Sequence, residues 1–161
     1  MMNDRAKALI EALRLFPHPE GGFYREIFRS SSVVCPRDAR GERSAATAIY
    51  FLLVSGSCSR WHKVASDELW IHLEGSAIEL WSLDWPERLL SSSMLGPLDA
   101  HSAPIRTIPA GAWQAAEISG EYALAACIVA PGFEFEDFEM IRAGSEQDRW
   151  LRQNGRGAGC L

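Results

Sequence analysis

The stretch Gly56–Gly75 reads GSCSRWHKVASDELWIHLEG, with a glycine at each end and charged, aromatic and imidazole side chains between them. Because successive side chains of a β-strand point to opposite faces, Glu68, Trp70 and His72 share one face if this segment is extended. A carboxylate, an indole and an imidazole make a poor apolar core but a suitable lining for a pocket inside a barrel. The stretch therefore predicts a strand that borders a polar cavity.

The rest of the chain continues in short segments that are typical of β-structure. Phe23–Arg29 alternates, and Ala45–Val54 is apolar, with β-branched and aromatic residues in its middle. Ser30–Arg43 is polar and indicates a surface loop, and Ser91–Ala103 indicates a long connection. Further strands are expected near 59–64, 67–73, 76–83, 104–108, 112–118 and 122–130. This spacing predicts an all-β fold, a jelly-roll barrel.

Both ends of the chain differ from this pattern. Residues 3–15 predict one short helix outside the barrel, because Asn3 suits an N-cap and apolar residues recur on one face. Residues 146–161, which include GRGAG, indicate a frayed or disordered tail. The organisation expected is a single domain over residues 1–145, followed by this tail.

Composition excludes several classes of function. The chain has 161 residues, 47% of them hydrophobic and 23% charged, with a net charge of -5 and no long basic run. A nucleic-acid partner is therefore disfavoured, and no stretch is long and apolar enough to span a membrane. The N-terminus lacks the uninterrupted apolar run of a signal peptide. Four scattered cysteines without a CxxC pair predict reduced thiols and a cytoplasmic location.

Two motifs carry a resemblance to the cupin superfamily. The first cupin motif places a glycine, His-x-His, a glutamate and a second glycine at set intervals, and it resembles Gly56, His62, Glu68 and Gly75. Val64 stands where the second histidine belongs. The later stretch PAGAWQ, residues 109–114, is similar to the second motif, but it ends in glutamine where a histidine belongs.

The resemblance narrows to one branch of that superfamily, the uncharacterised proteins described as predicted cupin-superfamily sugar epimerases. It covers roughly residues 9–141 and rests on five blocks in order: LFPHPEGG from Leu15, TAIYFLL from Thr47, His62 to Trp70, PAGAWQ from Pro109 and VAPGF from Val129. It implies a double-stranded β-helix, the cupin jelly-roll barrel, with one cavity. It also implies a homodimer, but it does not settle a reaction.

The resemblance also places His62, Glu68 and Gln114 at the metal-ligand positions of cupins. One imidazole, one carboxylate and one amide form a weak, mostly oxygen site, better suited to Mn or Mg than to Zn or Cu. His72 lies about 13 Å further along an extended strand, so it is not expected to share the ion. The sequence leaves two alternatives open, a weakly bound divalent metal and a hydrogen-bonded His62 without any cofactor.

The same residues suggest acid–base chemistry. A buried Glu68 should have a raised pKa, and a neighbouring His62 could donate to it, so the two are the candidate catalytic couple for moving a proton next to a carbonyl. His18 and Glu20, in PHPEGG, belong either to a plain turn or to a rim over the cavity. Candidates for binding a small-molecule ligand are Trp70, His72, Trp113, Gln114, Tyr50 and Arg25.

Two functions from different classes fit these observations. The first is an isomerase or epimerase of a sugar-like or small carbonyl or acid substrate, with proton transfer by His62 and Glu68. The alternative is a non-catalytic cupin in which the eroded metal site has become a recognition pocket. In both cases we expect a homodimer built by strand pairing, because Phe23–Arg29 would lie at an edge that needs a partner.

Overall fold

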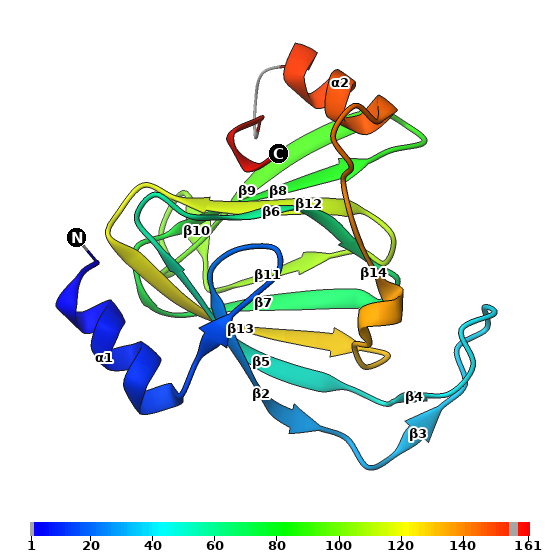
Figure 1. Cartoon of the computed structure of the whole chain (residues 1–161), viewed down its shortest axis with the longest axis horizontal. Coiled ribbons are helices and arrows are strands. Elements are labelled where there is room, and N and C mark those ends of the chain that lie inside the picture. The colour runs from blue at the N-terminus through cyan, green and yellow to red at the C-terminus, as the bar shows by residue number, and fades with distance from the viewer. Residues whose placement is uncertain (1, 155–157) are drawn as a thin grey trace.

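Two six-stranded sheets lie face to face in the computed structural model, which describes residues 2–154 and 158–161 (Figure 1). The first sheet has the order β1 (Phe16–Pro17), β2 (Phe23–Arg29), β5 (Thr47–Val54), β13 (Tyr122–Ala130), β7 (Asp67–Gly75), β11 (Ile105–Ile108). The second has the order β10 (Ser102–Ala103), β9 (Leu89–Leu95), β8 (Ile78–Asp84), β12 (Trp113–Ile118), β6 (Cys58–Val64), β14 (Phe138–Met140). Most neighbouring strands are not consecutive in the sequence, as in β5–β13–β7 and β8–β12–β6, and this arrangement confirms the predicted all-β jelly-roll barrel.

The register of these strands brings the two sequence motifs together. Gln114 of β12 pairs with His62 of β6, and Trp70 of β7 pairs with Cys127 of β13. Phe51, Trp70 and Leu80 belong to the apolar core between the sheets. The inward-facing polar residues therefore gather at one end of a barrel that is otherwise filled with apolar side chains.

The predicted N-terminal helix is α1 (Asp4–Leu13), and it lies outside the barrel. The side chain of Asn3 accepts hydrogen bonds from the backbone of Arg5 and Ala6, as expected for an N-cap. Leu9 packs with Leu52 of β5 and covers the outer face of the first sheet. The helix thus shields the outer side of the strand whose inner side faces the core.

Two segments that were predicted to be irregular contain strands. Leu89–Leu95 is β9, although most of it was expected to belong to a long connection. Its run of three serines hides the strand pattern, because β9 pairs fully with β8 on one side and only with the two-residue β10 on the other. The loop after β2 also contains a short hairpin, β3 (Val33–Val34) and β4 (Arg43–Ser44).

The expectation of a frayed tail is wrong for most of the residues after 145. The chain forms α2 (Glu146–Asn154) and a 3₁₀ turn, η2 (Ala158–Cys160), whereas residues 155–157 lie outside the described part of the chain. Leu151 and Cys160 are buried in a cluster on the second sheet with three tryptophans: Trp61, Trp81 and Trp113. The tail is ordered because it covers an apolar face that would otherwise meet water.

Two properties of the whole chain bear on its surroundings. In the part of the chain that the structure describes, no helix combines the length and apolarity needed to cross a bilayer. Cys35, Cys58, Cys127 and Cys160 are all free thiols.

Candidate functional site

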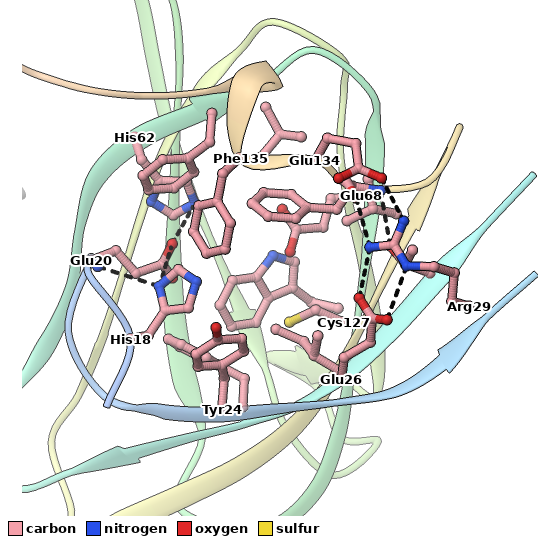
Figure 2. A pocket seen from close by; sticks show the side chains of 18 residues that line it. His18, Glu20, Tyr24, Glu26, Arg29, His62, Glu68, Cys127, Glu134 and Phe135 are labelled. Carbon is pink, nitrogen blue, oxygen red and sulfur yellow. Dashed lines mark hydrogen bonds and ion pairs between the residues drawn. The ribbon is translucent and has the colours of Figure 1, made fainter. Parts of the chain in front are cut away.

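A cavity of about 150 Å³ opens between the two sheets (Figure 2). Its walls come from β2, β5, β7 and β13 of the first sheet and from β6 and β14 of the second. The PHPEGG loop closes one side, and Phe133–Phe135 lies over it. A cavity of this size is on the scale of one that holds a molecule such as benzene.

The PHPEGG loop reaches the cavity because glycine permits a close approach to two strands. Gly22 has φ +66°, and a Cβ there would lie 2.7 Å from the carbonyl oxygen of Leu52. Gly21 has φ +113°, and a Cβ there would collide with the carbonyl oxygen of Cys58. The backbone N–H of Arg60 donates to the carbonyl of Glu20 at 2.8 Å. The loop is therefore fastened to β6, with the side chain of Glu20 buried.

Glu20 and His62 form a buried, closely spaced pair. His62 Nδ1 lies 2.7 Å from the carbonyl oxygen of Arg60. Since a carbonyl can only accept, Nδ1 carries a proton, and Nε2 of the neutral ring has a lone pair. That Nε2 lies 3.3 Å from Glu20 Oε2. In the neutral state the carboxyl proton of Glu20 therefore points at His62, and in the charged state it has moved to the ring.

Burial favours the neutral form of this pair. Burial raises the pKa of Glu20 to about 8, and the hydrogen bond from Ser59 and the charge of Arg60 offset this only in part. Ser59 Oγ donates to Glu20 Oε1 at 2.7 Å. Burial likewise lowers the pKa of His62, despite the opposing influence of Glu68. Glu20 is thus an acid that holds its proton near neutral pH.

His18 borders the same pair from the loop. Its Nδ1 accepts the backbone N–H of Glu20 at 3.3 Å and lies 3.4 Å from Glu20 Oε2. Burial, followed by repulsion from His62, lowers the pKa of His18 to about 4. His18 is therefore an uncharged polar group at neutral pH.

The second buried carboxyl group, Glu68, is held by a hydrogen-bonded chain. Trp70 Nε1 donates to Gln114 Oε1 at 3.1 Å, and Gln114 Nε2 donates to Glu68 Oε2 at 2.6 Å. An indole N–H can only donate, so it determines which end of the amide faces Glu68. Burial and the nearby carboxyl group of Glu20 raise the pKa of Glu68, and His62 and the hydrogen bonds from Gln114 and Cys127 offset this rise only in part. Both hydrogen bonds favour the carboxylate form of Glu68.

Cys127 adds a thiol to the wall beside Glu68. Its side chain is buried, and burial raises the pKa of the thiol well above its ordinary value. The carboxyl groups of Glu68 and Glu20 act in the same direction. Cys127 therefore serves as an uncharged hydrogen-bond donor to Glu68 and not as a reactive thiolate.

An ion-paired group stands across the cavity from the histidines (Figure 2). Arg29 Nε and Nη2 donate to the two carboxylate oxygens of Glu26 at 3.0 and 2.8 Å. Arg29 Nη1 donates to Glu134 Oε1 at 2.6 Å, and Nη2 also donates to the carbonyl of Phe133 at 3.1 Å. The single guanidinium of the cavity is thus enclosed by two carboxylates.

The three residues at the cupin metal positions do not fit a shared metal ion. The amide oxygen of Gln114, its only possible ligand atom, accepts from the indole of Trp70. The free lone pair of His62 faces Glu20, and Glu68 receives the amide N–H of Gln114. In addition, within the part of the chain that is described, no group of three or more His, Cys, Asp or Glu residues is arranged to hold a metal.

The cavity gathers only part of the residues that the sequence suggested for it. His62, Glu68 and Trp70 line its wall, and Gln114 is buried next to Glu68. His72 is not part of the wall: it lies just before a register shift between β7 and β13, and its Nε2 lies 3.1 Å from the carbonyl oxygen of Ser76.

Three further candidates for ligand binding point away from the cavity, because the residue next to each in its strand points inward. Trp113 packs under the C-terminal segment, where Lys63 lies over its ring at 4.7 Å. Tyr50 packs beneath α1 with Leu52. Arg25 is bonded to the carbonyl of Leu13 at 3.2 Å.

The residues that sequence reasoning did not assign to the site come mostly from outside the two motifs. Glu20 and His18 were considered only as a turn or a rim, although the paired glycines of PHPEGG signal a close backbone approach. Arg29 and Cys127 lie on strands with no recognisable motif. Their positions follow from strand pairing, which local sequence does not reveal.

The whole chain is similar to known proteins. A family model described as "Cupin superfamily (DUF985)" matches residues 7–141. Among solved structures, a hypothetical protein from Leishmania major shares 30% identity, with a TM-score of 0.81 and 96% of each chain covered. A protein from Shewanella oneidensis is 32% identical, with a TM-score of 0.83, over 100% of this chain and 98% of that one.

More distant likenesses concern the fold alone. Oxalate decarboxylase from Bacillus subtilis is 15% identical, with a TM-score of 0.58, over 86% of this chain and 34% of that one. No curated protein matches the sequence.

Proposed function

Since this protein belongs to the cupin superfamily, in the family described as DUF985, we propose that its barrel cavity binds a small molecule and transfers a proton on it. The reaction class is that of an isomerase or epimerase, and the substrate is a small carbonyl or sugar-like compound. The family by itself supports only a cupin of open activity, so the proposal rests on the arrangement of acid and base groups.

The observation that carries this proposal is a pair of buried carboxyl groups with different environments in one cavity. Glu20 faces an imidazole lone pair and holds a proton near neutral pH, with a pKa of about 8. Burial raises the pKa of Glu68 as well, but His62 and the hydrogen bonds from Gln114 and from the thiol of Cys127 oppose this rise and favour the ionised form. Two titratable groups whose environments differ in this way are suited to opposite roles as acid and base.

The roles follow from these environments. The carboxylate of Glu68 removes the proton from the carbon next to the carbonyl, while the carboxyl group of Glu20 donates its proton to the carbonyl oxygen. With a 2-hydroxycarbonyl substrate the result is an enediol. Glu68 then returns the proton to the neighbouring carbon while the ionised Glu20 takes the proton of the other hydroxyl group, which completes an isomerisation and regenerates both residues. An epimerisation requires the proton to return to the opposite face of the same carbon. His62 acts as a positioning residue, because its lone pair orients the acidic proton of Glu20.

Deuterium exchange tests this assignment. The purified protein is incubated in D₂O with small aldoses, ketoses and 2-hydroxycarbonyl compounds, and NMR follows the loss of the proton next to the carbonyl. We expect exchange with at least one compound, reduced on the order of 100-fold or more in Glu68→Gln and in Glu20→Gln. Glu139→Gln is the matched control, because Glu139 pairs with Lys63 outside the cavity. Exchange that both cavity variants retain in full would contradict the acid and base roles of Glu20 and Glu68.

A non-catalytic binding protein is the second candidate, and the short hydrogen bond from Gln114 to Glu68 favours it. One carboxylate oxygen of Glu68 is already committed to Gln114 at 2.6 Å, as in a rigid recognition site. This alternative predicts ligand binding in a thermal-shift screen without proton exchange on any bound compound.

We also propose that the protein works in the cytoplasm. The support is the presence of four free cysteines, which suits a reducing compartment. Cell fractionation with an antibody against the native protein checks this, and recovery outside the cytoplasm would contradict it.

A further inference from the structure

The charge of the cavity wall is the starting point for identifying its ligand. Among the residues that the structure describes, the lining contains four carboxyl groups, those of Glu20, Glu26, Glu68 and Glu134, but only one arginine and no lysine. Arg29 donates through Nε, Nη1 and Nη2 to both Glu26 and Glu134. Since one positive charge faces two negative ones, this side of the cavity carries net negative charge, and the guanidinium is not available to an anion.

The histidines do not supply the missing positive charge. The pKa of His18 is lowered to about 4 by burial, and burial also lowers that of His62. His62 Nδ1 is in addition committed to the carbonyl of Arg60. Among the described residues, the other polar side-chain groups of the wall are uncharged: the hydroxyls of Tyr24 and Thr47, the thiol of Cys127 and the indole N–H of Trp70. The lining thus offers an anion no unpaired cationic partner.

Aromatic rings form much of the remaining wall. Phe133 and Phe135 meet edge to face with centroids 5.1 Å apart, and Phe51 and Trp70 do so at 5.5 Å. The rings that line the cavity are those of Tyr24, Phe51, Trp70, Phe133, Phe135 and Phe138. The face of an aromatic ring carries negative partial charge and attracts a cation within about 6 Å.

We propose that the cavity recognises a small organic cation, so that the substrate carries an ammonium group beside its reacting carbonyl or hydroxyl carbon. The proposal rests on the proposed function, because it identifies the ligand of the same cavity. Carboxylates and ring faces both stabilise a positive charge, whereas the hydroxyl groups of an uncharged sugar can form hydrogen bonds with the carboxylates but gain nothing from their charge beyond that. Phe135 lies between the histidines and the Glu134 side, where it can cover the bound group (Figure 2).

Calorimetry with matched probes tests the charge requirement. Methylammonium, tetramethylammonium and choline are the cations, 3,3-dimethylbutan-1-ol is the uncharged counterpart of choline, and acetate is the anion. We expect at least one cation to bind, and choline to bind at least tenfold more tightly than its uncharged counterpart. Equal or tighter binding of the alcohol, tightest binding of acetate, or no binding of any cation at millimolar concentration would overturn the proposal.

Two variants separate the contributions of ring and charge. Phe135→Leu keeps an apolar side chain and removes a ring face, so it should weaken cation binding about fivefold. Phe16→Leu is its control, because Phe16 is an exposed ring that does not line the cavity. Glu134→Gln removes one rim charge and should weaken cation binding while allowing acetate to bind. Glu139→Gln should change neither cation binding nor acetate binding. Equal effects of the test and control variants would contradict a role for the cavity wall in cation binding.

The two experiments can fail separately. If uncharged hydroxycarbonyl compounds exchange deuterium while ammonium ions do not bind, the isomerase stands and the cation site is refuted. If ammonium ions bind but neither hydroxycarbonyl compounds nor their amino-substituted counterparts exchange deuterium, the cation site stands and catalysis is refuted.

Discussion

At the residue scale, the tautomer of His62 determines what Glu20 can do. Because Nδ1 donates to the carbonyl of Arg60, the remaining lone pair on Nε2 can accept the proton of Glu20. The protonated carboxyl group of Glu20 is therefore stable although it is buried. This arrangement couples the stability of the fold to pH.

Our first prediction concerns this coupling. The folded pKa of Glu20, about 8, lies above its ordinary value of 4.5, so its contribution to stability is complete below pH 4.5 and is lost as the pH rises toward 8. His18 acts in the opposite sense, because its folded pKa of about 4 lies below 6.5 and stability is lost as the pH falls between them. Above pH 6.5 only the ionisation of Glu20 acts among these two groups, so the free energy of unfolding should fall by about 2 kcal/mol between pH 6.5 and pH 8.

Glu20→Gln isolates the effect in urea unfolding curves at pH 6.5 and pH 8. The amide can donate to His62 and accept from Ser59, as the protonated carboxyl group does, but it does not ionise. The decline in stability should therefore shrink markedly in Glu20→Gln and persist in Glu139→Gln. A variant that loses as much stability as the natural protein would show that another group causes the decline.

The second prediction concerns Gln114, which links Trp70 to Glu68. Gln114→Leu keeps the side-chain size but leaves the buried indole N–H and the carboxyl group of Glu68 without this partner. Each unsatisfied buried group costs about 1–3 kcal/mol, so we expect a loss of roughly 2–5 kcal/mol in the free energy of unfolding. Gln153→Leu on the exposed face of α2 is the control. A loss below 1 kcal/mol for Gln114→Leu would contradict a structural role for the hydrogen bonds that join Trp70, Gln114 and Glu68.

At the element scale, strand alternation decides which residues of each motif meet the ligand. Trp61 and Trp113 lie on the outer face of the second sheet, whereas their neighbours His62 and Gln114 point inward. These two tryptophans therefore stabilise the fold and do not contact the ligand, and α2 covers them.

The third prediction tests this cover. Leu151 is fully buried between α2 and the tryptophans, so Leu151→Ala should destabilise the protein by roughly 2–5 kcal/mol. Tryptophan fluorescence should also shift to the red as water reaches the outer face of the sheet. Gln153→Ala in the same helix should leave both quantities unchanged. If Leu151→Ala behaves like this control, the C-terminal segment does not contribute to the stable fold.

At the scale of the whole molecule, one edge of the first sheet remains open. β1 pairs only with Phe23 and Tyr24 of β2, and within the described chain no strand is paired with the same edge further along β2. Ile27 and Phe28 are 45% and 53% exposed there, and the short hairpin that follows exposes Val33. An open edge with exposed apolar side chains favours pairing with a second chain.

Our fourth prediction is accordingly a homodimer formed by pairing of β2 with its symmetry mate. Sedimentation at micromolar concentration should give twice the monomer mass for the natural protein and the monomer mass for the double variant Ile27→Lys, Phe28→Lys. Leu98→Lys, at another exposed apolar site, is the control and should remain dimeric. A monomeric natural protein, or a double variant that stays dimeric, would refute this interface.

The barrel, the outer helix and the position of the main strands could be predicted from the sequence, because they depend on alternation, capping and turns within short segments. Strand alternation placed Glu68 and Trp70 on the cavity wall, and the cupin resemblance placed His62 there. Alternation also placed His72 with them, and this was wrong. Applied with the correct register, alternation would also have excluded Trp113, whose neighbour Gln114 points inward.

Only the tertiary structure decided the rest of the site. Glu20 meets Ser59 from 39 residues away, and Arg29 meets Glu134 from 105 residues away, through contacts that no local pattern encodes. The tail was expected to be disordered because its own sequence is polar and rich in glycine, yet Leu151 and Cys160 are buried in a tryptophan face formed by distant strands. Local sequence determines which way a strand's side chains point, whereas the identity of the groups that they meet depends on how the whole chain closes.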